Sequence, residues 1–198
     1  DLAGFNGDIP TAELFIRSAQ MAAFCPIMQY HAESKAEFNQ DRTPWNIAER
    51  TNDDRAISGY RFFANLRMNL LPYIVEQAKL SAENGVPLMR AMVIHCSDDP
   101  KTYSMYDQFF FGDSLLVAPV IEEGAEKRSV YLPKDKWVNF FNKEVYSGSR
   151  FINVNAPLME IPVFQKNNSC IITNLSKDQP SLGSYVGNTV THYRYPVI

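Results

Sequence analysis

Apolar residues before residue 85 recur at helical spacing. A first amphipathic segment begins near Pro10 and Thr11 with TAELFIRSAQMAAF, and its spacing predicts a helix with one buried face. The apolar positions assigned to that face are Leu14, Phe15, Ala19 and Ala22. The next run, FCPIMQYH, is short, apolar and broken by Pro26, so we expect a buried strand that ends at His31.

A second amphipathic segment follows a polar stretch and extends from about residue 53 to about residue 82. Its apolar residues recur at steps of three and four, as in a helix with one buried face. They are Ile57, Tyr60, Phe63, Leu66, Leu70, Leu71 and Ile74. Pro72 has no backbone N–H to donate, so it must kink this helix or divide it. Asn84 and Gly85 predict its end.

Beyond residue 85 the pattern is that of β-structure. Short apolar or alternating runs are separated by turn-forming groups such as DDP, EEG, PKDK and SGS. The runs are PLMRAMVI, QFFFG, SLLVAPVI, RSVYLP, WVNFF, MEIPVF and CIITNL. Several short strands at this spacing predict an antiparallel β-sandwich.

The strand–helix order before residue 85 is typical of a parallel sheet or a (β/α) barrel. Two such units cannot close a barrel of eight, and their strands would lack neighbours. We therefore interpret Asp1, which follows no Met or polar leader, as a cut end with further chain before it. The apolar helix faces would then need a partner: the remainder of the parent polypeptide or a second copy of this chain.

Composition excludes several classes of function. The 198 residues are 45% hydrophobic and 13% aromatic, which is enough for a substantial core. A formal charge of -3 gives no basic surface for nucleic acid. No uninterrupted apolar run approaches the length of a membrane span, so we expect no membrane partner.

The cysteines and histidines do not form a recognisable metal or redox motif. Cys25, Cys96 and Cys170 are few, odd in number and far apart, which predicts reduced thiols and a cytoplasmic location. His31, His95 and His192 lack metal-ligand spacing, and a Cys25–His31 pair lacks the helix N-terminus that activates a thiol. Asp98 and Asp99, before Pro100, are interpreted as a turn. We expect no metal and no cofactor.

A set of motifs in unbroken order carries a family resemblance. DLAGF, IRSAQMAAFCPIMQYH, PW, NLLPYI, GVPLMRAM, QFFFGDSLLVAPV, VYLP and APLMEIPVF resemble the C-terminal part of glycoside hydrolase family 31, over about residues 1 to 172. That family contains α-glucosidases, α-xylosidases and sulfoquinovosidases. The resemblance implies that residues 1–84 are the last two βα units of a catalytic (β/α)8 barrel, 85–168 a proximal C-terminal β-sandwich and 169–198 the start of a distal β-domain.

The resemblance also implies a role for three residues. Asp1 and Phe5 match the acid and the aromatic ring of the family's DIGGF motif, and His31 matches a histidine after the eighth barrel strand. These positions line the subsite for the terminal nonreducing sugar. The two catalytic aspartates of a retaining mechanism lie upstream of DLAGF in the family, so we expect no catalytic residue in this chain and no activity from the chain alone. The implied substrate is an oligosaccharide or α-glycoside.

One residue of this region departs from the family pattern, and the role of two others is left open by the sequence. Gln29 stands where many members have Arg, and losing that cation must alter recognition near the subsite. The QYH variant together with DRTPW resembles a subgroup that includes the sulfoquinovosidases. Arg42 and Trp45 of DRTPW either bind sugar or form a salt-bridged loop anchor with a buried Trp, and the sequence leaves both readings open.

The competing interpretation is a carbohydrate-binding or structural β-module without catalytic function. Its sugar-stacking surface would come from aromatic residues of the second half, although such residues more often fill a sandwich core. They are Trp137, Phe140, Phe141, Tyr146 and Phe151. Barrel elements in the first 80 residues would argue against this interpretation, because a binding module has no use for them.

Overall fold

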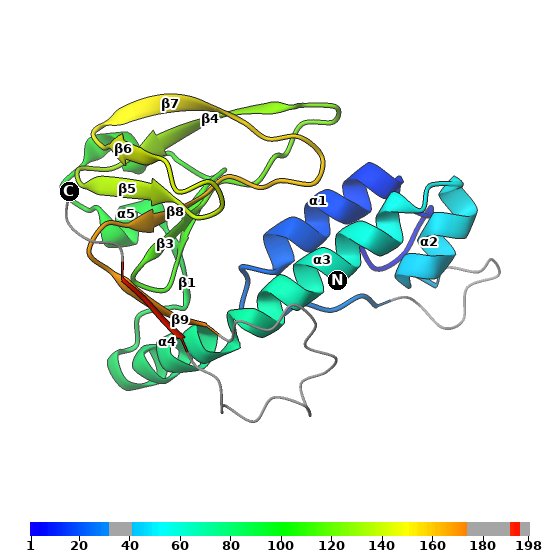
Figure 1. Cartoon of the computed structure of the whole chain (residues 1–198), viewed down its shortest axis with the longest axis horizontal. Coiled ribbons are helices and arrows are strands. Elements are labelled where there is room, and N and C mark those ends of the chain that lie inside the picture. The colour runs from blue at the N-terminus through cyan, green and yellow to red at the C-terminus, as the bar shows by residue number, and fades with distance from the viewer. Residues whose placement is uncertain (32–40, 174–190, 195–198) are drawn as a thin grey trace.

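The computed structural model describes residues 1–31, 41–173 and 191–194. The chain has a helical half followed by a β-rich half (Figure 1). The helical half contains α1 (Ala12–Ala22), α2 (Pro44–Thr51), α3 (Arg55–Asn69) and α4 (Leu71–Asn84). The first part of the β-rich half also contains two short helical turns, α5 (Met92–His95) and η1 (Pro100–Thr102).

Helix α1 begins where the sequence predicts. The Thr11 side chain caps it by accepting a hydrogen bond from the Leu14 backbone N–H. Its buried face differs from the predicted one, because Leu14 is 54% exposed and Ile16 is fully buried. The reason is the contact with α3, where Gly59 lies directly against Ile16 and allows the two helices to approach closely.

Pro72 divides the second amphipathic segment into two helices. It occupies the first turn of α4, where its missing N–H leaves no bond unmade. Gly85 ends α4 in the left-handed conformation at φ 74°, as the Asn-Gly pair predicts. Tyr73, on the first turn of α4, is fully buried against the β-rich half.

The predicted strand ending at His31 is not formed as a strand. Residues 27–31 form neither helix nor strand, and the Leu2 N–H donates to the Gln29 carbonyl at 3.0 Å. Among the described residues no strand precedes Met89. A parallel strand needs a ladder of hydrogen bonds to a neighbour, and the single Leu2–Gln29 bond does not make one. The barrel strands expected from the resemblance are therefore not formed among the described residues.

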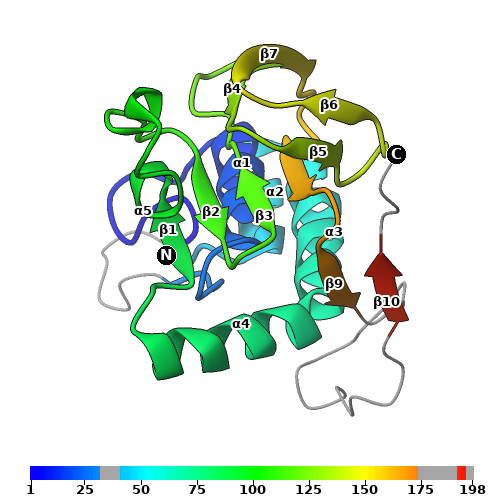
Figure 2. The same cartoon turned by 90° about the vertical axis from the view of Figure 1, so that its left-hand side faces the viewer.

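The β-rich half is built from antiparallel pairs. A six-stranded sheet has the order β1-β2-β3-β8-β5-β6, and β4 pairs with β7 in a separate ribbon (Figures 1 and 2). The sheet strands are β1 (Met89–Ala91), β2 (Phe109–Phe111), β3 (Leu115–Val117), β8 (Val163–Lys166), β5 (Lys136–Asn139) and β6 (Val145–Ser147). The ribbon strands are β4 (Lys127–Leu132) and β7 (Arg150–Asn155).

The six-stranded sheet has a core on each face because its strands alternate. Phe109 and Phe111 belong to the core shared with the helices, whereas Phe110 belongs to the core beneath the β4–β7 ribbon. Val163 and Phe164 divide in the same way. The sheet and ribbon thus form the predicted sandwich, and the sheet's other face rests on the helical half.

The two halves are joined by polar anchors as well as by the shared core. The Tyr73 hydroxyl donates to the Phe111 carbonyl at 2.7 Å and accepts from the Ser114 N–H at 3.2 Å. Arg17, on α1, donates to four carbonyls of the β-rich half, including Ala156 and Glu160 at 2.9 and 3.0 Å. These bonds fix α1 and α4 to the sheet and ribbon.

The sequence patterns missed or misplaced several elements. Helix α2 falls in a stretch interpreted as a loop, and residues 92–95 of PLMRAMVIH form the turn α5 instead of continuing a strand. Strands β6 and β7 were not predicted, since their exposed faces dilute the apolar signal. The expected distal domain at 169–198 is described only as the pair β9 (Cys170–Thr173) and β10 (Thr191–Arg194), and its other residues from 174 onward lie outside the described ones.

Candidate functional site

Four of the residues singled out in the sequence lie together at the N-terminal segment. The Asp1 carboxylate accepts a hydrogen bond from the Gln29 amide at 3.5 Å and lies 3.7 Å from His31 Nδ1. The Phe5 and His31 rings are 4.9 Å apart between centroids and tilted by 37°. Asp1, Phe5, Gln29 and His31, hereafter the Asp1–His31 cluster, therefore converge from two segments that are about 25 residues apart in sequence.

The cluster is accessible to a ligand. The side chains of Asp1 and His31 are 35% and 59% exposed, and Phe5 is 38% exposed. An acceptor carboxylate, a donor amide, an imidazole and a ring face are the groups that bind sugar hydroxyls and C–H faces. The arrangement can hold a polar, ring-shaped ligand, but it contains a single carboxylate.

Arg42 supports the segment that carries Asp1 and Phe5. Arg42 is 2% exposed, and its guanidinium donates to the carbonyls of Ala3, Asn6, Gly7 and Asp8, with the Asn6 bond at 2.8 Å. These bonds make Arg42 a loop anchor. They differ from the salt bridge considered from the sequence, because the partners are carbonyls.

The turn that Arg42 holds is conformationally costly. Ala3 has φ 54° and Gly4 has φ 98°, and a non-glycine residue in the left-handed region costs about 1 kcal/mol. Ala3 is not a glycine, so it carries this cost directly. Its backbone N–H donates to the Ser18 hydroxyl of α1 at 2.8 Å, which offsets part of the cost.

Arg67, which the sequence analysis did not single out, supports the second segment. From α3 it donates to the carbonyls of Ala22, Ala23, Cys25 and Pro26, with the last two bonds at 2.6 and 2.7 Å. Burial lowers the pKa of Arg67. No pattern marks this arginine in the sequence, since its partners are backbone carbonyls more than 40 residues away.

Trp45 lies near the cluster but outside it. It sits in the first turn of α2, is 60% exposed and contacts the Tyr30 ring edge-on at 6.4 Å. Tyr30 in turn packs against Tyr60 of α3 at 5.8 Å. The buried Trp considered from the sequence is therefore not what the structure shows. Trp45 instead presents an exposed ring next to Tyr30, which lies between Gln29 and His31.

Two other titratable residues considered in the sequence, Cys25 and His95, are partly buried. Burial raises the pKa of the Cys25 thiol, which opposes a nucleophilic role. His95 stacks on Phe110 at 4.1 Å, and its pKa is lowered by burial and then by Arg90. No group of three or more His, Cys, Asp or Glu suited to a metal occurs within the described residues.

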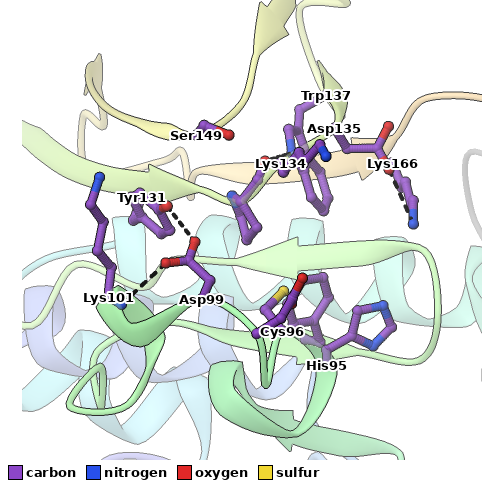
Figure 3. Close-up of a pocket in the computed structure, with 13 residues that line it drawn as sticks. His95, Cys96, Asp99, Lys101, Tyr131, Lys134, Asp135, Trp137, Ser149 and Lys166 are labelled. Atoms are coloured by element: carbon purple, nitrogen blue, oxygen red, sulfur yellow. Dashed lines mark hydrogen bonds and ion pairs between the residues drawn. The ribbon is translucent and has the colours of Figure 1, made fainter.

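A cavity of about 480 Å³ lies where the Asp98–Asp99 turn meets the ribbon (Figure 3). Asp99 accepts from the Lys101 N–H at 3.1 Å and from the Tyr131 hydroxyl, and Lys166 pairs with Asp135 at 3.1 Å. Burial and the Asp99 carboxylate raise the pKa of Tyr131 to about 12. The carboxylates of Asp99 and Asp135 are thus engaged within the protein, and they do not form a catalytic pair.

The described chain contains no helix whose length and apolar character would allow it to cross a membrane.

Comparison with known proteins identifies the family in both halves. Residues 1–77 match the glycosyl hydrolases family 31 TIM-barrel domain, and residues 85–171 match the family 31 C-terminal domain. An isomaltosyltransferase from Sporosarcina globispora is 43% identical over 98% of this chain and 18% of its own length. A 1,3-alpha-isomaltosidase from Kribbella flavida is 40% identical over 91% of this chain and 24% of its own length.

Solved structures of similar proteins support the same family assignment. A cycloalternan-forming enzyme from Listeria monocytogenes, in complex with a pentasaccharide substrate, is 42% identical and superposes with a TM-score of 0.86 over 89% of this chain and 17% of its own. The chain spans about a fifth of the length of these relatives. The matches to both domains, in the same order and at this identity, show that the chain belongs to glycoside hydrolase family 31.

Proposed function

We propose that the chain is the C-terminal portion of a retaining α-glycosidase that acts on terminal α-linked glucose units. The Asp1–His31 cluster forms part of the pocket for the nonreducing sugar, and the two catalytic carboxylates belong to the polypeptide outside this chain. The observation that carries the proposal is the convergence of Asp1, Gln29 and His31 from two separate segments.

Each residue of the cluster has a defined binding role in this proposal. The Asp1 carboxylate accepts hydrogen bonds from sugar hydroxyls, and the Gln29 amide and His31 imidazole donate to others. The Phe5 ring, in contact with His31, covers a C–H face of the sugar. Arg42 and Arg67 act as positioning residues, since they hold the two segments without being part of the cluster.

The cluster favours a neutral sugar over a sulfonated one. A sulfonate requires fixed cationic donors, and the guanidinium nearest in the sequence motif, Arg42, donates its hydrogen bonds to loop carbonyls. Gln29 stands where an Arg would supply a cation. The relatives named for isomaltosyl chemistry are also more similar, at 40% and 43% identity, than the sulfoquinovosidases at 32% and 34%. An isomaltosyl or glucosyl unit is therefore the proposed ligand.

The proposal is tested with His31→Ala in the complete polypeptide. Removing a donor to the sugar should lower kcat/KM for an aryl α-glucoside or an isomaltosyl substrate by about 2 to 4 kcal/mol of transition-state stabilisation. Because the His31 side chain is 59% exposed, the thermal unfolding temperature should stay the same. An unchanged kcat/KM would remove His31 from the pocket.

A second measurement separates this proposal from the non-catalytic β-module. The 198-residue chain alone should show no hydrolysis above the solvent background, whereas the complete polypeptide should hydrolyse α-glucosides. Oligosaccharide binding by a complete polypeptide without any hydrolysis would favour the binding module instead. A cytoplasmic location and self-association of the chain stay as proposals, tested by cell fractionation and by the mass in solution.

A further inference from the structure

A second cavity, of about 530 Å³, lies in the β-rich half between the β5–β6 hairpin and the end of β7. This volume falls within the usual range for small-molecule sites. Residues 157–162, which follow β7, form its third wall. It shares no residue with the Asp1–His31 cluster. We call it the Asn153 pocket, after one of four asparagines that line it: Asn139, Asn142, Asn153 and Asn155.

The strand alternation of β7 supplies two of these amides. Val154 is buried in the core beneath the ribbon, whereas Asn153 and Asn155 on either side of it are exposed, and all three residues line the pocket. Within the described residues neither side chain has a hydrogen-bond partner. Each amide therefore offers a donor and an acceptor to a ligand at adjacent positions of one rigid strand.

The β5–β6 turn supplies the other two amides in a fixed orientation. The Asn139 side-chain oxygen accepts from the Phe141 and Asn142 N–H groups at 2.9 and 3.1 Å. The Asn142 oxygen accepts from the Glu144 N–H at 3.0 Å. Since both oxygens are used by the turn, the NH2 groups are the parts that remain as donors for a ligand.

Aromatic rings and carboxylates complete the lining. Phe141 and Tyr146 are half-buried, and each is held edge-on by a neighbouring ring, Phe140 at 5.3 Å and Phe164 at 5.6 Å. The Tyr146 hydroxyl donates to the Glu144 carboxylate. Of the aromatic residues that could form a sugar-stacking surface, these two line the pocket, whereas Trp137 is 2% exposed in the core.

The third wall is held rigidly by the helical half. Arg17 donates to the carbonyls of Ala156, Pro157 and Glu160, and the Gln20 amide donates to the Leu158 carbonyl at 2.6 Å. A wall fixed before binding reduces the ordering cost of a ligand. The Glu160 side chain stays exposed at the pocket and adds an acceptor.

The charges of the lining restrict the ligand. No Lys, Arg or His lines the pocket, which disfavours phosphate, sulfonate or carboxylate ligands. Two carboxylates, Glu144 and Glu160, with one already bound to Tyr146, are a poor set for a divalent cation. Amides, carboxylates and half-buried rings together fit a neutral polyhydroxyl ring.

We propose that the Asn153 pocket is a non-catalytic binding site for a neutral oligosaccharide, which holds part of a long substrate chain away from the catalytic pocket. The choice of an α-linked glucan as that oligosaccharide rests on the proposed function. The site itself rests on the lining residues alone. Such a site would raise the affinity for polymers through a second point of attachment, with no effect on short substrates.

The test uses the complete polypeptide with its catalytic pocket blocked by an iminosugar, and dextran and isomaltohexaose as probes. The double substitution Asn153→Ala and Asn155→Ala should weaken binding about tenfold, as expected for two lost hydrogen-bonding groups. Glu160→Gln is a milder second variant, and Glu83→Gln, at an exposed position of α4, is its matched control. Hydrolysis of an aryl α-glucoside should be the same in all variants, which also shows that they are folded.

The outcomes separate the two proposals. Weaker polymer binding with unchanged aryl glucoside hydrolysis supports the site. Polymer binding that depends on Asn153 and Asn155 in a polypeptide without hydrolysis supports the site and overturns the proposed function. Equal polymer binding by the double variant and the unsubstituted polypeptide, at unchanged hydrolysis, overturns the site.

Discussion

The segments that carry the Asp1–His31 cluster and the strands of the β-rich half satisfy their backbone carbonyls in different ways. In the sheet and ribbon, antiparallel neighbours accept and donate along whole strands. In residues 3–8 and 22–26, several carbonyls receive hydrogen bonds from two arginine side chains, Arg42 and Arg67. One region is held by repeated main-chain pairing and the other mainly by two guanidinium groups.

The difference has a physical consequence for robustness. A ladder distributes its hydrogen bonds over many residues, so a single side chain rarely controls it. A guanidinium that binds four carbonyls concentrates the same task in one residue, and its loss leaves several acceptors unpaired at once. Side-chain substitutions should therefore disturb the Asp1–His31 cluster more easily, whereas the β-rich half should respond mainly to changes that move its backbone.

The largest expected effect comes from a substitution that displaces the backbone of the β-rich half. A Cβ at Gly148 would lie 1.8 Å from the Pro133 carbonyl oxygen, so Gly148→Ala must displace the chain between β6 and β7. We expect a loss of about 3 kcal/mol or more in the free energy of unfolding, measured by urea denaturation of the complete polypeptide.

Gly124→Ala is the matched control for that substitution. Gly124 has φ 71° but nothing within 4 Å of an added Cβ, so the cost should be only the backbone term of about 1 kcal/mol. Equal losses in the free energy of unfolding for the two variants would show that the close contact at Gly148 does not contribute to the stability of the ribbon.

The next effect tests the arginine-held region. Arg67→Met removes the four hydrogen bonds to residues 22–26 and should lower kcat/KM for an α-glucoside about tenfold or more, because His31 follows the loosened segment. The unfolding temperature should also fall. Arg67→Lys should recover little, since an ammonium cannot reproduce the planar fork of donors.

Arg61→Met on the exposed side of the same helix is the control, and it should leave activity and stability unchanged. A full-activity Arg67→Met variant would contradict the idea that this guanidinium positions His31.

The smallest expected effect concerns the reactivity of the Cys96 thiol in the β-rich half. Burial, then Asp99 and Asp98, raise the pKa of the Cys96 thiol from 9.0 to about 11. The thiolate is therefore scarce below that pH, and alkylation by iodoacetamide at pH 8.5, followed by mass spectrometry, should be slower than for free cysteine.

The raised pKa of Cys96 also makes the stability of the folded state depend on pH. Because the folded pKa lies above the unfolded one, the contribution of Cys96 is present below pH 9 and is lost as the pH rises toward 11. Alkylation of Cys96 at the rate of free cysteine would show that its surroundings are more open than the structure indicates.

Local patterns predicted those elements whose signals lie close together in the sequence. Thr11, Pro72 and Gly85 mark helix boundaries through their own backbone and side-chain chemistry, and all three lie where the sequence predicts. The short apolar run Phe109, Phe110 and Phe111, which ends at Gly112, predicts a strand for the same reason. The exposed strands β6 and β7 were missed because an edge position and an exposed face weaken the apolar alternation.

The sequence by itself determined the start of α1, the division of the second helical segment at Pro72, the β-rich character of the second half and the family resemblance. It also marked Asp1, Gln29 and His31 as candidate site residues. Only the tertiary structure decided that Leu14 is exposed, that Arg42 and Arg67 bind carbonyls, and that the asparagines of β5–β7 line one pocket. The physical reason is range: caps, turns and periodicity act within a few residues, whereas a guanidinium or a cavity depends on groups that only packing brings together.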